Sequence, residues 1–486
     1  MLLKRLYDER LAQASYLVGC QATGEALVVD PNRDAEAYLA AARAEGVRIT
    51  HVTETHIHAD FLSGSRELAA RAGARLLLSD EGGDDWRYRF AASDGATLLR
   101  DGSTFEIGNL RFAVLHTPGH TPEHLSFLIT DTAASEWPMG VFTGDFVFVG
   151  DVGRPDLLEK AAGVGGTMER AARQLFQSLR KFRELPDYLQ LWPGHGAGSA
   201  CGKALGAVPQ TTLGYEKLAN WAFALDGEDE FVAAVLAGQP EPPRYFAEMK
   251  RLNRDGPPLL GARPGPERLP AERLATLLDT PERERPLVVD VRKGADYAAR
   301  HVAGTINVPF GKSFTTWAGW LVPYDRDFYL VVDDAGGQSV ADVVRALRMI
   351  GLDRVAGWLG RDAIEAWARA GREIGRVPQT TPADLAGALG RPGVHVVDVR
   401  ARSEWEAGHM PGVPNVHAGH ILDRLDELPR DGRLVLHCQS GSRSLIAASV
   451  LRARGFTNVE NLAGGLGAWE RAGYPVEREG ALSNAG

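Results

Sequence analysis

Cysteine is scarce in this chain, and its scarcity limits the classes of protein to be considered. Only Cys20, Cys201 and Cys438 occur among 486 residues, and no two of them form a CxxC pair. This pattern excludes a dense disulfide framework. Isolated free thiols favour a reducing compartment, so we expect a cytoplasmic protein.

Long apolar runs and an excess of positive charge are also missing. No apolar stretch approaches the roughly 20 residues of a membrane-spanning helix, and the opening MLLKRLYDERLAQASYLV has scattered charges where a secretory signal has an apolar core. We therefore expect no membrane association. The formal net charge of −9 argues against a nucleic-acid-binding protein. Small anionic substrates remain possible, because a local basic pocket can form on an acidic protein.

The composition is that of a globular protein with several domains. Apolar residues make up 44% and charged residues 24% of the chain, and 486 residues suggest about three domains. The Pro/Gly-rich stretch DGPPLLGARPGPERLP, at 255–270, is a candidate linker. We predict domains at 1–255, 265–375 and 376–486, and we call the last two the middle repeat and the last repeat.

These two repeats are copies of one α/β unit. LVVDVRKGADYAARHVAGTINVPF begins at Leu287, and the similar HVVDVRARSEWEAGHMPGVPNVH begins at His395. Each copy continues with a further apolar strand and a helical pattern, and ends near AWARAGREI or AWERAGYPV. Strands that alternate with helices favour a parallel sheet with helices on both faces.

Histidines and acids in the first predicted domain follow apolar, strand-like runs. They occur in the phrases THIHADF, TPGH, FTGD and WPGHG. Because sites in α/β proteins lie beyond the carboxyl ends of strands, we expect these side chains to converge. Imidazoles and carboxylates that converge there predict a metal site. In chain order the set comprises His56, His58, Asp60, His120, Asp145 and His195.

This ordered set resembles the metallo-β-lactamase superfamily. The resemblance implies a four-layer αβ/βα sandwich with the site at one edge. The usual motif of the superfamily is HxHxDH, which gives two metal ions, whereas position 61 is Phe here. An apolar ring in place of a nitrogen ligand should greatly weaken the binding of a metal ion at the second position. Two histidines and one carboxylate with open positions form the facial triad of non-heme Fe(II) oxygenases.

The persulfide dioxygenase branch of the superfamily uses such a site. The resemblance implies one Fe(II) per chain, a homo-oligomer, and a reaction of a thiol persulfide, O2 and water that yields the thiol and sulfite. No local motif distinguishes glutathione from coenzyme A as the carrier thiol. In the phrase GDVGRPD, Arg154 is expected either to hold a substrate anion or to brace the site. The iron ligands that the resemblance implies are His56, His120 and Asp145. The residues that it implies as orienting the ligands and water are His58, Asp60 and His195.

A cysteine ends the strand LVLH of the last repeat, and a helix is expected from about Leu445. The backbone N–H groups of a Gly/Ser-rich loop that opens a helix form an anion-binding nest. With VVDVR and EWEAGHMPG upstream, this loop resembles the CxxGxR active loop of rhodanese sulfurtransferases. The resemblance implies that Cys438 accepts and donates sulfur. It implies a substrate cradle formed by Gln439, Ser440, Gly441, Ser442 and Arg443.

The middle repeat contains no cysteine, and Asp334 stands about where the thiol should be. A carboxylate cannot carry a persulfide. We therefore expect a non-catalytic rhodanese-like domain, and its role in spacing, docking or dimerisation stays open.

Sulfite is the product expected of the first site and a usual sulfur acceptor for rhodaneses, so the two sites together would form thiosulfate. The order of domains resembles the persulfide dioxygenase–rhodanese fusions of bacterial sulfide detoxification. The rhodanese could equally take sulfur from thiosulfate and supply the iron site. Two other functions stay open: a two-metal hydrolase of the glyoxalase II type, and a sulfur-relay protein without redox chemistry. Cys201, a few residues beyond His195, either relays sulfur or only packs.

Overall fold

The structure is a computed structural model that describes the chain apart from residues 158, 160–165, 204, 262–263, 282 and 479–486. The end of the last repeat and part of the candidate linker therefore lie outside the described residues. The chain forms two compact units. The first comprises Met1–Arg263 with Arg345–Gly351, and the second comprises Pro264–Val344 with Leu352–Gly486. Among the described residues, no helix is both long enough and apolar enough to cross a membrane.

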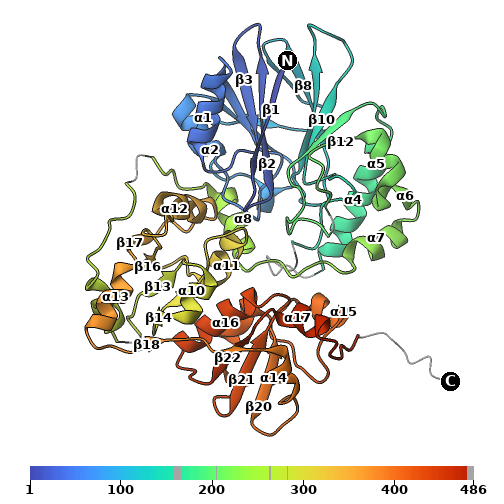
Figure 1. Cartoon of the computed structure of the whole chain (residues 1–486). Helices are drawn as coiled ribbons and strands as arrows, with labels where there is room; N and C mark the ends of the chain where they lie inside the picture. Colours follow the sequence, from blue (N-terminus) through green and yellow to red (C-terminus); the bar gives the residue numbers. More distant parts are fainter. Residues whose placement is uncertain (158, 160–165, 204, 262–263, 282, 479–486) are drawn as a thin grey trace, which may run out of the picture. The chain divides into compact units, whose positions relative to one another are not determined.

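Two six-stranded sheets form the centre of the first unit (Figure 1). In spatial order, the first sheet comprises β1 (Leu2–Asp8), β2 (Gln13–Cys20), β3 (Glu25–Val29), β4 (Arg48–Thr53), β5 (Arg75–Ser79) and β6 (Thr97–Leu99). The second comprises β12 (Thr211–Thr212), β11 (Gln190–Pro193), β10 (Gly140–Gly144), β9 (Leu125–Asp131), β8 (Leu110–His116) and β7 (Thr104–Ile107). The helical segments are α1 (Ala35–Ala44), α2 (Ser65–Ala72), η1 (Asp84–Trp86), α4 (Met168–Phe182), α5 (Leu213–Ala219), α6 (Trp221–Ala224), α7 (Glu228–Leu236) and α8 (Tyr245–Asp255).

Strand residues in this unit alternate between separate cores, as the two-residue period of a strand requires. In β3, Val28 contributes to the core with α1 and α2, whereas Leu27 contributes to the core between the sheets. In β10, Val141 packs in the core with α4 and α7, whereas Phe142 lies between the sheets. The unit is therefore a helix–sheet–sheet–helix sandwich, as predicted.

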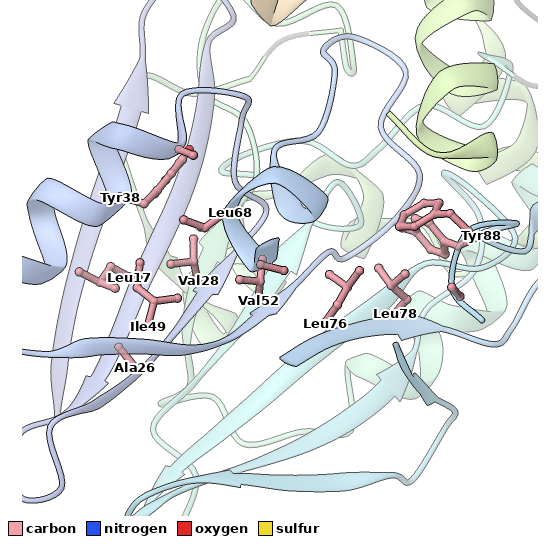
Figure 2. Packing of buried hydrophobic residues seen from close by; sticks show 14 of the residues in the cluster. Leu17, Ala26, Val28, Tyr38, Ile49, Val52, Leu68, Leu76, Leu78 and Tyr88 are labelled. Atoms are coloured by element: carbon pink, nitrogen blue, oxygen red, sulfur yellow. The ribbon is translucent and has the colours of Figure 1, made fainter. Parts of the chain in front are cut away.

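Figure 2 shows the core beneath α1 and α2. Leu17, Val28 and Val52 come from three strands of the first sheet and lie in one layer with Leu68 of α2 and Tyr38 of α1. Each of these side chains is at most 1% exposed. Burial of a side chain of this size stabilises the fold by roughly 1.5–3 kcal/mol. This packing fixes β4, which leads into the predicted metal ligands.

The second unit holds two four-stranded parallel sheets, one from each repeat. In spatial order, the sheet of the middle repeat comprises β15 (Ile306–Asn307), β13 (Leu287–Asp290), β16 (Phe328–Val331) and β17 (Val355–Leu359). That of the last repeat comprises β19 (Gln379–Thr380), β22 (Val459–Leu462), β21 (Arg433–His437) and β20 (Val394–Asp398). A separate pair comprises β14 (His301–Val302) and β18 (Ile374–Gly375). The helical segments are α9 (Arg273–Leu278), α10 (Gly294–Ala299), α11 (Phe314–Leu321), α12 (Val340–Met349), α13 (Asp362–Arg369), α14 (Pro382–Ala386), α15 (Arg402–Ala407), η2 (Ala418–Asp423), η3 (Leu425–Glu427), α16 (Ser442–Ala453) and α17 (Gly465–Arg471). Only Val340–Val344 of α12 belongs to this unit.

The two repeats share a buried ion pair at the end of the VVDVR strand. Arg292 Nη2 lies 2.6 Å from Asp290 Oδ2, and Arg400 Nη2 lies 2.7 Å from Asp398 Oδ2. In each repeat an asparagine amide also donates to the backbone carbonyls of both members of the pair. These asparagines are Asn307 and Asn415. The internal repeat that the sequence predicts is therefore a repeat of structure, and these residues brace the sheet.

Candidate functional site

Loops that follow strands of the first unit carry the predicted metal site. His56 lies just beyond β4, His120 lies in the loop between β8 and β9, and His195 lies just beyond β11. Asp145 directly follows β10, where Gly144 has a φ of +49°. A Cβ at that glycine would lie 2.4 Å from a neighbouring side-chain oxygen, so glycine is needed for this turn.

Three of the predicted residues offer ligand atoms to one point. The ligand atoms of His56, His120 and Asp145 all lie within 4.8 Å of one another, and all three side chains are buried. Asp145 Oδ2 lies 3.7 Å from His56 Nε2 and 3.5 Å from His120 Nε2. Among the residues that the structure describes, His56 Nε2 and Asp145 Oδ2 find no hydrogen-bond partner. Because unpaired buried polar atoms are costly, this geometry fits residues that bind a metal ion.

In both His56 and His120, the ring nitrogen Nδ1 has a hydrogen-bond partner that sets the tautomer of the imidazole. The hydroxyl of Thr55 donates to Asp30 Oδ2 at 2.9 Å, so Thr55 Oγ1 accepts from His56 Nδ1, also at 2.9 Å. His120 Nδ1 donates to the carbonyl oxygen of Arg154 at 3.0 Å. Both Nε2 atoms are then left with a free lone pair, as metal binding requires.

The ionisation states also suit a metal site. Burial holds the pKa of His56 well below its usual value and lowers that of His120, so both imidazoles are neutral. Burial alone would raise the pKa of Asp145, but the charge of His195 and its hydrogen bond hold it well below its usual value. Neutral imidazoles and an ionised carboxylate are the forms that bind a metal ion.

Asp145 is oriented by His195, whose Nδ1 donates to Asp145 Oδ1 at 2.7 Å. On its other side, His195 Nε2 lies 2.8 Å from Asp60 Oδ2, without the geometry of a hydrogen bond. Burial opposes the charged form of His195, yet the two carboxylates raise its pKa well above its usual value. His58 also lies next to a carboxylate, because its Nε2 is 3.2 Å from Asp30 Oδ1. The three residues expected to orient the ligands therefore all lie at the site.

Cys201 lies closer to this site than the sequence could show. Its sulfur lies within 4.8 Å of ligand atoms of Asp60 and His195. Burial and the two nearby carboxylates, Asp60 and Asp145, raise the pKa of this thiol well above its usual value. The ring of Phe61 is fully buried, with its centre 4.3 Å from that of His58. Phe61 does remove one nitrogen ligand, but a second cluster of potential ligands, Asp60–His195–Cys201, remains.

Of the two roles expected for Arg154, the brace fits its contacts. Its guanidinium is fully buried and makes a double hydrogen bond to Asp156, at 2.7 and 2.8 Å. It also donates to the carbonyl oxygens of Ala200 and Pro240, at 3.0 and 2.6 Å. Since Nε, Nη1 and Nη2 all have partners, these contacts give no support to binding of a substrate anion. Through its own carbonyl, Arg154 positions His120.

The helical tail, which comprises the helices α5 to α8 after β12, supplies a residue that holds the loop carrying His56 and His58. Asn253, at the end of α8, donates to the carbonyl oxygens of His58 and Phe61, both at 2.8 Å. Its Oδ1 accepts from the backbone N–H of Ser63, also at 2.8 Å. The tail is therefore part of the framework of the metal site.

Two further buried residues, Asp30 and His124, contribute to this site and were not predicted from the sequence. Asp30 follows β3 and accepts from both the backbone N–H and the hydroxyl of Thr55. His124 Nε2 accepts from the backbone N–H of Asp145 at 3.2 Å, and its Nδ1 is 2.9 Å from Thr117 Oγ1. Two sequence patterns could have indicated them: Asp30 ends the apolar run EALVVD, and His124 ends TPEH, which nearly repeats TPGH.

In the last repeat, Cys438 lies between β21 and α16 as predicted, although the helix begins at Ser442, earlier than expected. The buried sulfur accepts from the backbone N–H of Gly441 at 3.2 Å and from Ser444 Oγ at 3.5 Å. Arg443 makes a double hydrogen bond to Glu404, at 2.6 and 2.8 Å. The loop thus directs N–H and hydroxyl donors at the thiol.

The remaining residues of the predicted cradle differ in exposure. Gly441 has a φ of +91°, and a Cβ there would lie 3.1 Å from the carbonyl oxygen of Leu462. Ser440 and Ser442 are exposed and lie 3.3 Å apart through their hydroxyl oxygens. Gln439 Oε1 accepts from Arg400 at 3.3 Å. The serines and Gln439 therefore form the outer edge of the loop.

The strand register corrects the position assigned to the missing thiol of the middle repeat. Asp398 pairs with His437 in the last repeat, and Asp290 pairs with Val331 in the middle repeat. The residue after each strand is Cys438 in one and Val332 in the other. The equivalent of the thiol is therefore Val332, not Asp334, which lies farther along and pairs with Arg268 at 2.9 Å. A valine cannot carry sulfur, so the expectation of a non-catalytic repeat is unchanged.

Comparison with known families agrees with these folds. A family model described as "Metallo-beta-lactamase superfamily" matches residues 8–195. A second, described as "Rhodanese-like domain", matches residues 271–369 and 381–472. The predicted fold class, a metallo-β-lactamase domain followed by two rhodanese-like domains, is therefore confirmed.

The chain belongs to the metallo-β-lactamase superfamily. A crystal structure of a metallo-beta-lactamase from Staphylococcus aureus subsp. aureus COL is 42% identical, covers 74% of this chain and 99% of that chain, and has a TM-score of 0.66. A hydroxyacylglutathione hydrolase of Rhodospirillum rubrum is 34% identical over 180 residues, which are 37% of this chain and 60% of that relative. The crystal structure of ETHE1 from Myxococcus xanthus is 28% identical, covers 52% of this chain and 98% of that chain, and has a TM-score of 0.43.

Proposed function

We propose that the first unit is a persulfide dioxygenase with one Fe(II) per chain, and that Cys438 transfers sulfur in the last repeat. The observation that carries the first part is the buried triad of His56, His120 and Asp145, with ligand atoms within 4.8 Å. Two nitrogen donors and one carboxylate are the set used by non-heme Fe(II) oxygenases. When bound, iron would supply the redox chemistry that O2 requires.

The protein's own residues would orient and shield the reactants. His195 fixes Asp145, and Arg154 fixes His120 through its carbonyl. Such partners keep the ligands in the geometry that leaves coordination positions open for substrates. The buried ring of Phe61 contributes an apolar wall, which would keep bulk water away from a reactive sulfur compound.

Sulfur transfer at Cys438 needs no oxidant. The thiolate attacks the outer sulfur of a persulfide, the S–S bond breaks, and the carrier leaves as a thiolate with the electron pair. Sulfite then attacks the outer sulfur on Cys438, which releases thiosulfate and the Cys438 thiolate. The donors from Gly441 and Ser444 would stabilise the anionic sulfur in both steps. The same residues serve the reverse transfer, from thiosulfate to a thiol.

The decisive experiment is oxygen consumption by the purified chain with glutathione persulfide, with the metal content of the same sample determined. We expect rapid uptake, about one iron per chain, and sulfite or thiosulfate as product. No uptake by an iron-loaded sample with either glutathione persulfide or coenzyme A persulfide would refute the dioxygenase.

A two-metal hydrolase of the glyoxalase II type is the alternative that one observation favours. Asp60, His195 and Cys201 form a second cluster of buried potential ligands beside the triad. The name of the Rhodospirillum relative points the same way. Two metal ions per chain, hydrolysis of a hydroxyacyl thioester of glutathione, and no oxygen uptake would establish this alternative. Metal analysis of Cys201→Ala would then show whether the thiol holds the second ion.

A further inference from the structure

A cavity of about 1320 Å³ lies between the two repeats of the second unit. Its lining comes from α10, from the segment that leads into α11, from residues 376–379, and from the loop that opens α16. Gly441 lines the cavity and donates its N–H to Cys438 Sγ, so the cavity adjoins the reactive thiol. Pockets for drug-sized ligands hold roughly 300–1,000 Å³. Sulfite or thiosulfate alone would leave most of this space unfilled.

The wall from the middle repeat is held firmly against the helix that carries the thiol loop. The buried backbone N–H of Asn307 donates to Ser449 Oγ of α16 at 2.8 Å. A Cβ on Gly294, at the start of α10, would lie 2.9 Å from Leu445 Cδ2. Such close packing leaves the two sides of the cavity in a fixed relation.

The charged residues that line the cavity are all cations: Lys312, Arg376 and Arg443. Arg443 is neutralised by its double hydrogen bond to Glu404. Lys312 and Arg376 are exposed, and neither has an ion pair or hydrogen bond with any residue that the structure describes. The cavity therefore presents two uncompensated positive charges, one from the middle repeat and one from the segment that joins the repeats.

We propose that this cavity binds the low-molecular-weight thiol that carries sulfur to or from Cys438, and that Lys312 and Arg376 recognise its anionic groups. The inference rests on the proposed sulfur transfer at Cys438. A thiol with carboxylate or phosphate groups on an organic chain fits, since the cations attract its charges while Pro309 and Trp317 offer apolar surface. The middle repeat thereby forms one wall of the cavity in which the last repeat binds its substrate.

The cavity serves sulfur transfer to Cys438 and sulfur transfer from Cys438 alike. With thiosulfate as donor, the Cys438 thiolate attacks the outer sulfur, and sulfite leaves with the electron pair of the broken S–S bond. The bound carrier thiolate then attacks the outer sulfur of the Cys438 persulfide. The carrier leaves as a persulfide, and Cys438 returns as a thiolate.

The test uses the full chain, with thiosulfate as donor and acceptors that differ in charge and size. Cyanide and 2-mercaptoethanol lack a recognition group, glutathione has carboxylates and coenzyme A has phosphates. The variant is Lys312→Ala with Arg376→Ala. The matched control is Arg369→Ala, which removes an exposed cation of the same repeat that does not line the cavity.

For the double variant we expect the KM for an anionic thiol to rise about five- to tenfold, with kcat little changed. The anionic acceptor with the larger rise identifies the carrier, by carboxylates or by phosphates. With thiosulfate at saturating concentration, rates with cyanide and 2-mercaptoethanol should stay within about twofold of the wild type, as should all rates of the control.

Normal cyanide kinetics with an unchanged KM for both anionic thiols would overturn the inference while leaving the sulfurtransferase intact. An equal loss with cyanide, glutathione and 2-mercaptoethanol would also overturn it, because the cations would then support the loop in general. Absence of thiocyanate formation by the wild type would instead refute sulfur transfer at Cys438, and the inference with it.

Discussion

At the residue scale, Asp145 contacts four histidines of the metal site: His56, His120, His124 and His195. One carboxylate oxygen faces the two ligand imidazoles, and the other accepts from His195. Its backbone N–H donates to His124. Removing the carboxylate would therefore remove a ligand and leave three buried imidazoles without their shared anion.

We expect Asp145→Ala to reduce bound metal from about one ion per chain to nearly none and to abolish oxygen uptake. Sulfur transfer from thiosulfate to cyanide should stay within about twofold of the wild type, because Cys438 belongs to the other compact unit. Metal analysis, oxygen consumption and thiocyanate formation on one preparation measure all three. Retention of both metal and oxygen uptake would disprove the ligand assignment.

At the same scale, Cys438→Ser replaces the thiol without changing its size greatly. A hydroxyl cannot form a persulfide under these conditions, so sulfur transfer should vanish while oxygen uptake stays largely intact. The product formed from persulfide should change from thiosulfate to sulfite, which separation of the two anions would show. Enzymatic thiosulfate from this variant would contradict the role of the last repeat. Cys20→Ser, at the end of β2, is a control that should change neither product.

At the scale of elements, the turn from β21 into α16 depends on one glycine. In Gly441→Ala, the side chain would have to adopt a φ of +91°, with its Cβ 3.1 Å from the carbonyl oxygen of Leu462. Strain of this kind costs roughly 1–2 kcal/mol. We expect a corresponding loss of unfolding free energy in denaturant titration, together with at least a tenfold slower sulfur transfer. Ser440→Ala, on the exposed side of the loop, should leave stability within about 0.5 kcal/mol.

Elements whose signals are local in the chain could be predicted from sequence. The VVDVR strands, the order of the repeats, and the strand-end positions of His56, His120 and Asp145 all follow from apolar runs next to polar residues. The structure brings these three side chains together as expected. The pattern of apolar residues indicates where each strand lies, because a strand must be apolar where it is buried.

Contacts between distant segments could not be predicted in the same way. Asp30 reaches Thr55 from another strand, and Cys201 approaches Asp60 from a loop far along the chain. No local pattern encodes such pairings, since they depend on the packing of whole layers. The counterpart of Cys438 was predicted as Asp334 instead of Val332 for a related reason. Only the pairing of neighbouring strands shows which residue of the middle repeat occupies the same position as Cys438.

At the scale of the whole molecule, the two compact units should respond separately to loss of metal. A bound ion stabilises only the folded form of the unit that holds it. We expect chelation to lower the midpoint of one thermal transition by roughly 5–15 °C and to leave the other within about 1 °C. Differential scanning calorimetry measures both. Asp145→Ala should resemble the chelated protein and be insensitive to chelator, whereas equal shifts of both transitions would contradict this division.

The hydrogen bonds from the helical tail have a consequence for the timing of assembly. Arg154 needs the carbonyl oxygen of Pro240, and the loop between His58 and Phe61 needs the amide of Asn253. Both partners are synthesised well after His195. A nascent chain that has just emerged with the histidines of the metal site, up to His195, would still lack one partner of the Arg154 guanidinium and the amide that holds the ligand loop. During translation, the centre should therefore become competent to take up its ion only once α8 has left the ribosome.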